Sequence, residues 1–289
     1  MEALLVTLGG GSSQSSPWPV ATRARVSGAA RAAGELHGGN TITTTTLGRF
    51  PARAGADRNA FLLLTVLVWA GVLSGFGTDS FEHVRKHGLD YPLIVHCHAV
   101  AFVGWLVLFT VQVALIRNGR PDLHRRLGMA GAGLAAVMVV LGPATALHVD
   151  AARFAATGRT PEFLAVQLID IVAFAGLTGA GLLLRGNAAA HKRLMLLGLI
   201  YISDAGFARL LNGFVAVPFG ETRWGEFTAL YFCSDLLMLG LGAYDLVTRG
   251  RLHPAYVAGV AWMVALQCTA LVLLNDAGWK ALSLHLIGP

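Results

Sequence analysis

Charged residues are scarce in this chain of 289 residues. Lys, Arg, Asp and Glu together make up 13% of it, whereas a soluble domain carries about a quarter. Hydrophobic residues make up 55%, and the mean hydropathy is +0.60. An apolar excess of this size cannot be hidden in one soluble core, so the composition excludes an ordinary soluble enzyme.

Cysteine is also rare, and several catalytic motifs are missing. The three cysteines, Cys97, Cys233 and Cys268, all lie in apolar runs, which excludes a small disulfide scaffold. The sequence has no Walker-type loop, no Cys-x-x-Cys, no His-Glu-x-x-His and no strand-linked glycine fingerprint. Whether the chain is an enzyme is therefore left open by its motifs.

Long apolar runs are what the chain does have. A helix needs about 20 mainly apolar residues to cross a hydrocarbon core of about 30 Å. Seven segments qualify, at 60–75, 91–116, 127–147, 163–184, 193–217, 225–244 and 255–274. None shows the period-two alternation of a membrane barrel. The sequence therefore predicts an all-α integral membrane protein, a bundle of seven transmembrane helices.

Basic residues are divided unevenly between the connecting segments. Fifteen Lys and Arg residues lie before the first span or in the second, fourth and sixth connections, against six on the alternate side. Because cytoplasmic loops retain basic residues, the N-terminus is predicted inside and the C-terminus outside, in a multi-pass protein of the cell inner membrane. Anionic lipid headgroups then account for the net charge of +6, with no need for nucleic acid.

Residues 1–59 differ in composition from the rest. They are rich in Gly, Ala, Ser, Thr and Arg, and their only acids are Glu2, Glu35 and Asp57. Such a segment buries too little apolar surface to offset its ordering entropy. It is predicted to be a disordered, basic, low-complexity leader ahead of a transmembrane domain at 60–289. A transit peptide and an over-extended gene start are the alternatives, and the gene start is favoured.

Two predicted helix starts share a basic motif, His-Arg-Arg-Leu-Gly from residue 124 and His-Lys-Arg-Leu-Met from residue 191. Cations at a helix N-terminus oppose the helix dipole and favour a nearby anion, such as a lipid phosphate, a substrate phosphate or a haem propionate. A b-type haem needs two facing imidazoles and basic groups for its propionates. The alternative is ordinary positive-inside anchoring. The candidate cofactor-binding residues are His124 and His191, as ligands of the haem iron, with Arg125, Arg126, Lys192 and Arg193.

Ionisable residues inside the predicted spans form a second candidate site. Each costs about 2.5–3.5 kcal/mol on insertion scales, so each indicates function. Asp204 and Asp235 are expected near the midplane, where a carboxylate pair would hold a proton. Arg209 is turned away from Asp204 and is expected to pair with Asp170 at the same depth. The alternative is that these groups only bond helices together. The candidate ligand or proton site is His98, Asp170, Asp204, Arg209 and Asp235.

The stretch from His98 through Trp105, Gln112 and the two basic motifs resembles a family of bacterial multi-pass membrane proteins of uncharacterised function. The resemblance covers about 61–245 and implies no activity. A remoter likeness is to the cytochrome-b-type ferric and ascorbate reductase bundles, whose paired helix histidines hold two haems. This sequence departs from that pattern, because its fourth span has Gln167 and no histidine.

Three functions are consistent with these features. The leading hypothesis is a haem-binding redox subunit that uses the two histidines at the cytoplasmic helix starts. The alternative is a proton-coupled carrier or small-ligand receptor that uses the intramembrane Asp, Arg and His residues. A structural or assembly partner without a ligand is the third. The lipid bilayer is the expected partner in each case, and a homo-oligomer or an unknown redox partner remains open.

Overall fold

The computed structural model describes residue 50 and residues 54–288, apart from 216, 217, 219 and 221 and the side chains of 54 and 211–215. Residues 48–289 form one compact unit, and the description below concerns that unit alone. The predicted leader lies outside the described residues as far as residue 53, except for Phe50. All regular secondary structure in the described part is helical, which confirms the predicted all-α class.

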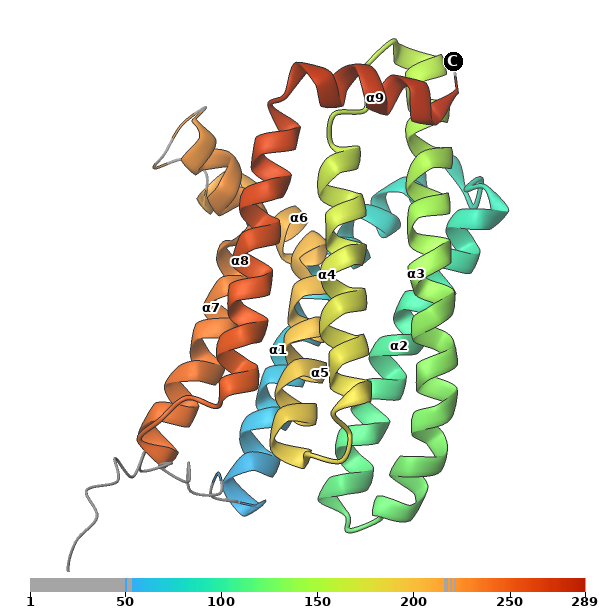
Figure 1. The fold of residues 1–289 in the computed structure, drawn as a ribbon. Helices are drawn as coiled ribbons and strands as arrows, with labels where there is room; N and C mark the ends of the chain where they lie inside the picture. Colours follow the sequence, from blue (N-terminus) through green and yellow to red (C-terminus); the bar gives the residue numbers. More distant parts are fainter. Residues whose placement is uncertain (1–49, 51–53, 216–217, 219, 221, 289) are drawn as a thin grey trace, which may run out of the picture. The chain divides into compact units, whose positions relative to one another are not determined.

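The helices follow one another with short connections (Figure 1). They are α1 (Ala54–His87), α2 (Leu93–Arg117), α3 (Pro121–Thr157), α4 (Leu164–Leu183), α5 (Ala188–Ile202), α6 (Asp204–Val215), α7 (Arg223–Arg249), α8 (Pro254–Leu274) and α9 (Ala277–Ile287). Within the described ranges, six of them are long and apolar enough to cross a membrane: α1, α2, α3, α4, α7 and α8. Helix α9 follows the last predicted span and was not expected from the sequence.

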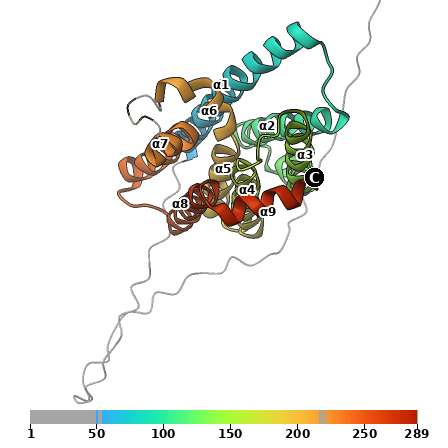
Figure 2. The same cartoon turned by 90° about the horizontal axis from the view of Figure 1, so that it is seen from above.

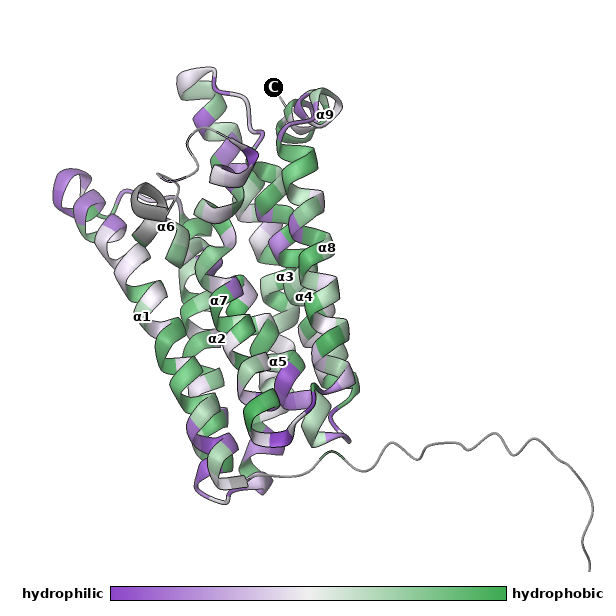
Figure 3. Ribbon diagram, turned by 90° about the vertical axis from the view of Figure 1, so that its left-hand side faces the viewer, coloured by the Kyte–Doolittle hydropathy of each residue, from purple (hydrophilic) through white to green (hydrophobic). Residues whose placement is uncertain are grey.

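Apolar side chains cover the outside of the helices. Val100 and Val140, in α2 and α3, are each 73% exposed. Figure 3 shows hydrophobic residues along the middle of the helices and hydrophilic residues concentrated toward their ends. A water-soluble domain would not leave so much aliphatic surface uncovered. The exposed surface and the helix lengths fit a multi-pass membrane protein.

The fifth predicted span is not one continuous helix. Helices α5 and α6 have 15 and 12 residues and are separated at Ser203. The Ser203 hydroxyl donates to the Ile200 carbonyl (2.7 Å), and the Asp204 carboxylate accepts from the Ala205 N–H (2.6 Å). Side chains that bond to nearby backbone in this way compete with the helical ladder. In the described part, six helices are therefore of membrane length, and the fifth predicted span is an interrupted pair of shorter helices.

The interruption lies in the middle of the bundle. Seen from above, α4 and α5 occupy the centre, α2 and α3 lie on one side, and α1, α6 and α7 lie on another (Figure 2). Helix α4 packs against α3, α5 and α8, and α6 packs against α1 and α7. The side chains of Leu199, Ile200 and Tyr201, which lead into the break, are fully buried. The polar residues at the break therefore face protein and not lipid.

Contacts between helix ends define two ends of the bundle. At the end that holds 117–126, 185–193 and 249–251, called the basic end below, the Arg117 guanidinium donates to the Asn59 side chain (2.7 Å). At the other end, called the α9 end, Lys280 pairs with Glu162 (3.0 Å). The basic residues counted in the second, fourth and sixth connections therefore gather at one end, as the orientation argument expects.

Glycines bring α1 and α6 into close contact. A methyl group added to Gly206 would lie 2.9 Å from the Cα atom of Val72. A methyl group on Gly75 would meet the carbonyl oxygen of Gly206, and one on Gly71 would meet the Phe207 ring. Gly71 and Gly75 have the spacing of four that lets membrane helices approach closely. This contact fixes α6, and with it Asp204, against α1.

The variant Gly206→Ala is expected to lose about 1–3 kcal/mol of unfolding free energy, because its methyl group has no space beside α1. Reversible unfolding in detergent micelles measures the change. Gly133→Ala is the matched control, because Gly133 is also helical and nothing lies within 4 Å of its added methyl group. Equal stability of the two variants would contradict the close packing of α6 on α1.

Candidate functional site

Five polar residues surround the helix interruption and are called the core cluster. They are Asp170 of α4, Tyr201 of α5, Asp204 of α6, and Tyr231 and Asp235 of α7. The side chains of Tyr201 and Tyr231 are 0% exposed, and those of Asp204 and Asp170 are 3% and 9% exposed. The two tyrosine ring centroids are 6.1 Å apart. Four helices thus contribute polar groups to one buried region.

Most of the core cluster lacks hydrogen-bond partners. The hydroxyls of Tyr201 and Tyr231, Oδ1 of Asp170 and Oδ2 of Asp204 are buried and have no partner among the described residues. Buried polar atoms in proteins are nearly always bonded, so each exception needs an explanation. These four atoms lie in one region and can make hydrogen bonds beyond those that other described residues supply. A bound proton, water or small ligand can form those bonds.

The carboxylates of the core cluster interact with one another. Asp204 interacts electrostatically with both Asp170 and Asp235. Asp235 also accepts a hydrogen bond from the amide of Gln267 on α8 (2.8 Å), and Gln267 is fully buried. The sequence placed the carboxylate pair at Asp204 and Asp235. In the structure Asp204 interacts with both Asp170 and Asp235, so three carboxylates and not two belong to the site.

Arg209 does not pair with Asp170, and that expectation was wrong. Its guanidinium bonds to Asp79 of α1 (3.2 Å) and lies over the Phe76 ring (4.3 Å). The reason is that α6 packs against α1, so this face of α6 points away from α4. Because Arg209 is already paired with Asp79, its positive charge is poorly placed to neutralise the carboxylates of the core cluster.

His98 also lies apart from the carboxylates. Its ring stacks on Phe102, one turn further along α2, with centroids 4.0 Å apart. Its Nδ1 atom is buried and has no hydrogen-bond partner among the described residues. Of the five residues expected to form the ligand or proton site, the structure therefore gathers Asp170, Asp204 and Asp235.

The histidines of the two basic motifs meet at the basic end. The ring centroids of His124 and His191 are 6.1 Å apart, and their planes are inclined by 85°. His191 Nδ1 donates to the Gly181 carbonyl (2.8 Å), since a carbonyl can only accept. Nδ1 of His124 is buried and unbonded in the described part of the chain. Arg125 and Arg126 are exposed to the surroundings.

The remaining basic residues of the motifs have carboxylate partners. Arg193 is 0% exposed and bonds to both oxygens of Asp245 through Nε and Nη2 (2.6 and 2.5 Å). Lys192 pairs with Asp57, and so does Arg249. These five residues are called the charge network.

Two of the four groups expected to hold haem propionates are thus neutralised by protein carboxylates. Arg125 and Arg126 are the two members of that set that remain exposed.

Sequence reasoning missed the acidic half of the charge network and part of the core cluster. Asp57 was counted only as an acid of the leader, although it is 7% exposed and part of α1. Asp245 and Arg249 are four residues apart, the spacing of an ion pair within a helix, and this spacing could have identified them from the sequence. Tyr231 lies one helical turn before Asp235 on α7, so the same spacing would have found it.

The chain was compared with protein-family models, curated proteins and solved structures. No family model, no curated protein and no solved structure matches it. Function is therefore argued from the geometry of the core cluster and the charge network. Within the described ranges, no group of three or more His, Cys, Asp and Glu side chains could hold a metal ion.

Proposed function

We propose that the chain is a proton-linked membrane carrier whose core cluster takes up and releases a proton. The observation that carries the proposal is the pair of buried carboxylates, Asp170 and Asp204, which lie beside two unbonded tyrosine hydroxyls at a helix interruption. Ionisable groups within membrane helices are costly and mark ion or proton pathways. Interrupted helices at membrane depth are common at the binding sites of transporters.

Charge balance supports a proton at this site. Arg209, a cation within electrostatic range of Asp204, is bonded to Asp79. Two carboxylates in a region of low dielectric constant cannot both stay ionised without a cation between them. A shared proton leaves one negative charge on the pair in place of two, and the hydroxyls of Tyr201 and Tyr231 offer donors and acceptors through which the proton can move.

The proposal includes an orientation. The basic end faces the cytoplasm, as the positive-inside rule requires. Helices α5 and α6 together then make the fifth crossing, so that the N-terminus lies inside and the C-terminus outside the inner membrane. The core cluster lies between the two ends, where a carrier needs a site that opens to each side in turn.

Access to the interruption tests the carrier directly. In a background without the three native cysteines, Ser203→Cys places a thiol of nearly the same size at the break, where Ser203 is 2% exposed. A membrane-impermeant thiol reagent is added to one side of reconstituted vesicles at a time. A carrier is expected to react from both sides, because its site alternates between them.

Two exposed residues give one-sided controls. Ala188→Cys at the basic end and Ala156→Cys near the α9 end are expected to react from opposite sides. Reaction of Ser203→Cys from one side only would indicate a receptor. No reaction from either side would indicate a structural role for the core cluster. Either result would overturn the proposed carrier.

A further inference from the structure

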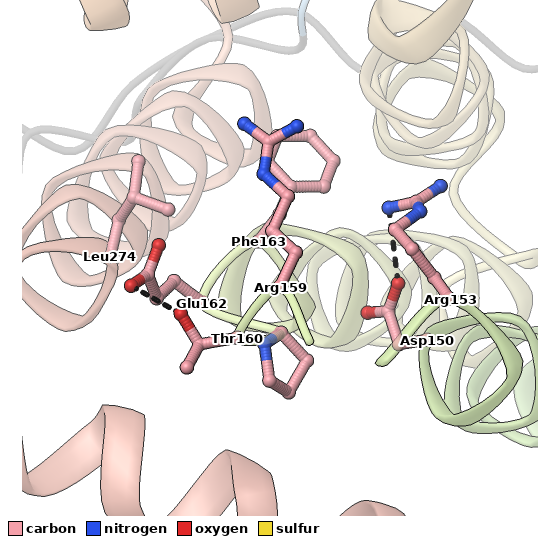
Figure 4. Close-up of a pocket in the computed structure, with 8 residues that line it drawn as sticks. Asp150, Arg153, Arg159, Thr160, Glu162, Phe163 and Leu274 are labelled. Carbon is pink, nitrogen blue, oxygen red and sulfur yellow. Dashed lines mark hydrogen bonds and ion pairs between the residues drawn. The ribbon is translucent and has the colours of Figure 1, made fainter. Parts of the chain in front are cut away.

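A second polar site lies at the α9 end, away from the core cluster. It is a pocket of about 320 Å³ between the end of α3, the start of α4 and the end of α8 (Figure 4). Its volume is at the lower end of the range for small-molecule sites, about 300–1,000 Å³. Its lining consists of Asp150, Arg153, Arg159, Thr160, Pro161, Glu162, Phe163 and Leu274.

The charges of the pocket are arranged in two groups. Asp150 accepts from Arg153 (3.3 Å) on one side, and Glu162 accepts from Thr160 (2.7 Å) on the other. Figure 4 shows Arg159 between the two groups. The lining thus carries two carboxylates and two guanidiniums, so a ligand that bears both signs of charge fits it better than a simple anion or cation.

Glu162 is ionised at neutral pH. The hydrogen bond from Thr160 and the ion pair with Lys280 hold the pKa of the Glu162 carboxyl below its usual value. Glu162 is also fixed in place, because the Trp279 indole of α9 donates to its backbone carbonyl (3.0 Å). One wall of the pocket is therefore a positioned negative charge.

Two side chains that line the pocket can make hydrogen bonds beyond those they already have. Asp150 is 2% exposed, and its Oδ2 atom is buried without a hydrogen-bond partner in the described part of the chain. The Arg159 guanidinium donates to none of the described residues, although it interacts electrostatically with Glu162. A buried carboxylate oxygen without a donor carries a large desolvation cost unless a ligand supplies one.

We propose that this pocket binds a small zwitterion. Asp150 holds its ammonium group, and Arg159 holds its carboxylate or phosphate. Phe163, which is 43% exposed, offers an apolar wall between the two charged ends. Guanidinium groups suit carboxylate and phosphate oxygens because their donors form a planar fork. The proposal does not depend on the carrier function of the core cluster.

Two sources supply this chemistry, a free amino acid and the headgroup of phosphatidylethanolamine. The full chain is purified in a detergent that contains no lipid amine and is titrated calorimetrically with L-alanine and, separately, with phosphoethanolamine. A free amino acid as ligand predicts saturable binding of L-alanine. A lipid headgroup predicts binding of phosphoethanolamine alone, and greater thermal stability in nanodiscs of phosphatidylethanolamine than of phosphatidylglycerol.

Variants connect the binding to the pocket. Asp150→Asn and Arg159→Gln are each expected to weaken the bound probe at least tenfold, because each removes a charge-assisted hydrogen bond. Arg223→Gln, an exposed arginine at the start of α7, serves as the matched control and should bind as the unaltered chain does. Both pocket variants should unfold at the unaltered temperature or higher without probe, which shows that they fold.

Two results would overturn the zwitterion site. One is the absence of saturable binding of both probes together with equal thermal stability in the two kinds of nanodisc. The other is binding or lipid-dependent stability that Asp150→Asn and Arg159→Gln leave unchanged. Neither result bears on the core cluster, whose test uses thiol access at the helix interruption.

Discussion

Replacing Asp245 with leucine is expected to lower the free energy of unfolding by about 3–5 kcal/mol. Asp245 is 0% exposed and binds both Nε and Nη2 of the fully buried Arg193. Without it, Arg193 keeps one hydrogen bond, from Nη1 to the Ala189 carbonyl (2.7 Å). A buried cation with no carboxylate is the main cause of the loss. Reversible unfolding in detergent micelles measures it.

A second substitution tests whether the loss of stability in Asp245→Leu comes from the unpaired charge of Arg193 or from misfolding of the variant. Arg193→Met added to Asp245→Leu removes the unpaired cation, and most of the stability is expected to return. Arg249 still pairs with Asp57 in that double variant. Arg125→Ala, at an exposed position of the neighbouring motif, should change stability little. No recovery in the double variant would contradict the role given to the Arg193 and Asp245 pair.

Replacing Asp170 with leucine is expected to raise the free energy of unfolding, whereas the same replacement at Asp245 lowers it. Asp170 is 9% exposed, and its Oδ1 atom has no partner among the described residues. Asp170→Leu should raise the free energy of unfolding by about 1–3 kcal/mol, because it removes one of two buried carboxylates that repel each other unless a proton is bound between them. Functional sites often keep such groups at a cost in stability. The unfolding assay used for Asp245→Leu gives the comparison.

Whether Asp170→Leu raises or lowers the free energy of unfolding distinguishes a functional role of Asp170 from a structural one. If Asp170 only bonded helices together, its removal would cost stability, by about 0.6 kcal/mol for an average interhelical hydrogen bond. A gain in stability with loss of two-sided thiol access at Ser203→Cys supports the carrier. A loss of stability at both Asp170 and Asp245 would instead place Asp170 in the structural framework.

The positions of most helices could be predicted from hydropathy alone, because each apolar run is long enough to cross a membrane. Their ends could not. Helix α1 begins at Ala54 and continues to His87, well beyond the predicted 60–75. The break at Ser203 was hidden by the hydropathy of 193–217 as a whole, since a one-residue interruption barely changes an average. Side-chain bonds to local backbone decide such breaks.

Close contacts between helices could also be predicted only in part from the sequence. The sequence has small residues four apart at Gly131 and Ala135 and at Ala175 and Gly179, a spacing that predicts close packing. A methyl group on Gly131 would lie 3.3 Å from the Leu108 side chain. Nothing lies within 4 Å of a methyl group on Gly179. Spacing marks a helix face as able to pack closely, but the neighbouring helix decides whether it does.

Pairing partners were the least predictable part of the candidate site. Depth along the helices suggested Asp170 for Arg209, but the side-by-side packing of α6 and α1 gave it Asp79. Asp57 reaches Lys192 although 135 residues separate them in the chain. Depth follows from sequence, whereas the choice between helices at equal depth depends on their order around the bundle.

Infrared difference spectroscopy between neutral and alkaline pH, where exposed carboxylates are ionised at both values, tests the central claim, that Asp170 and Asp204 share a proton. The account predicts a carbonyl stretching band of a protonated carboxylic acid in the reconstituted protein. The band should disappear in Asp170→Asn combined with Asp204→Asn and persist in Glu82→Gln, an exposed control. Absence of the band, or its persistence in the double variant, would contradict the proton site.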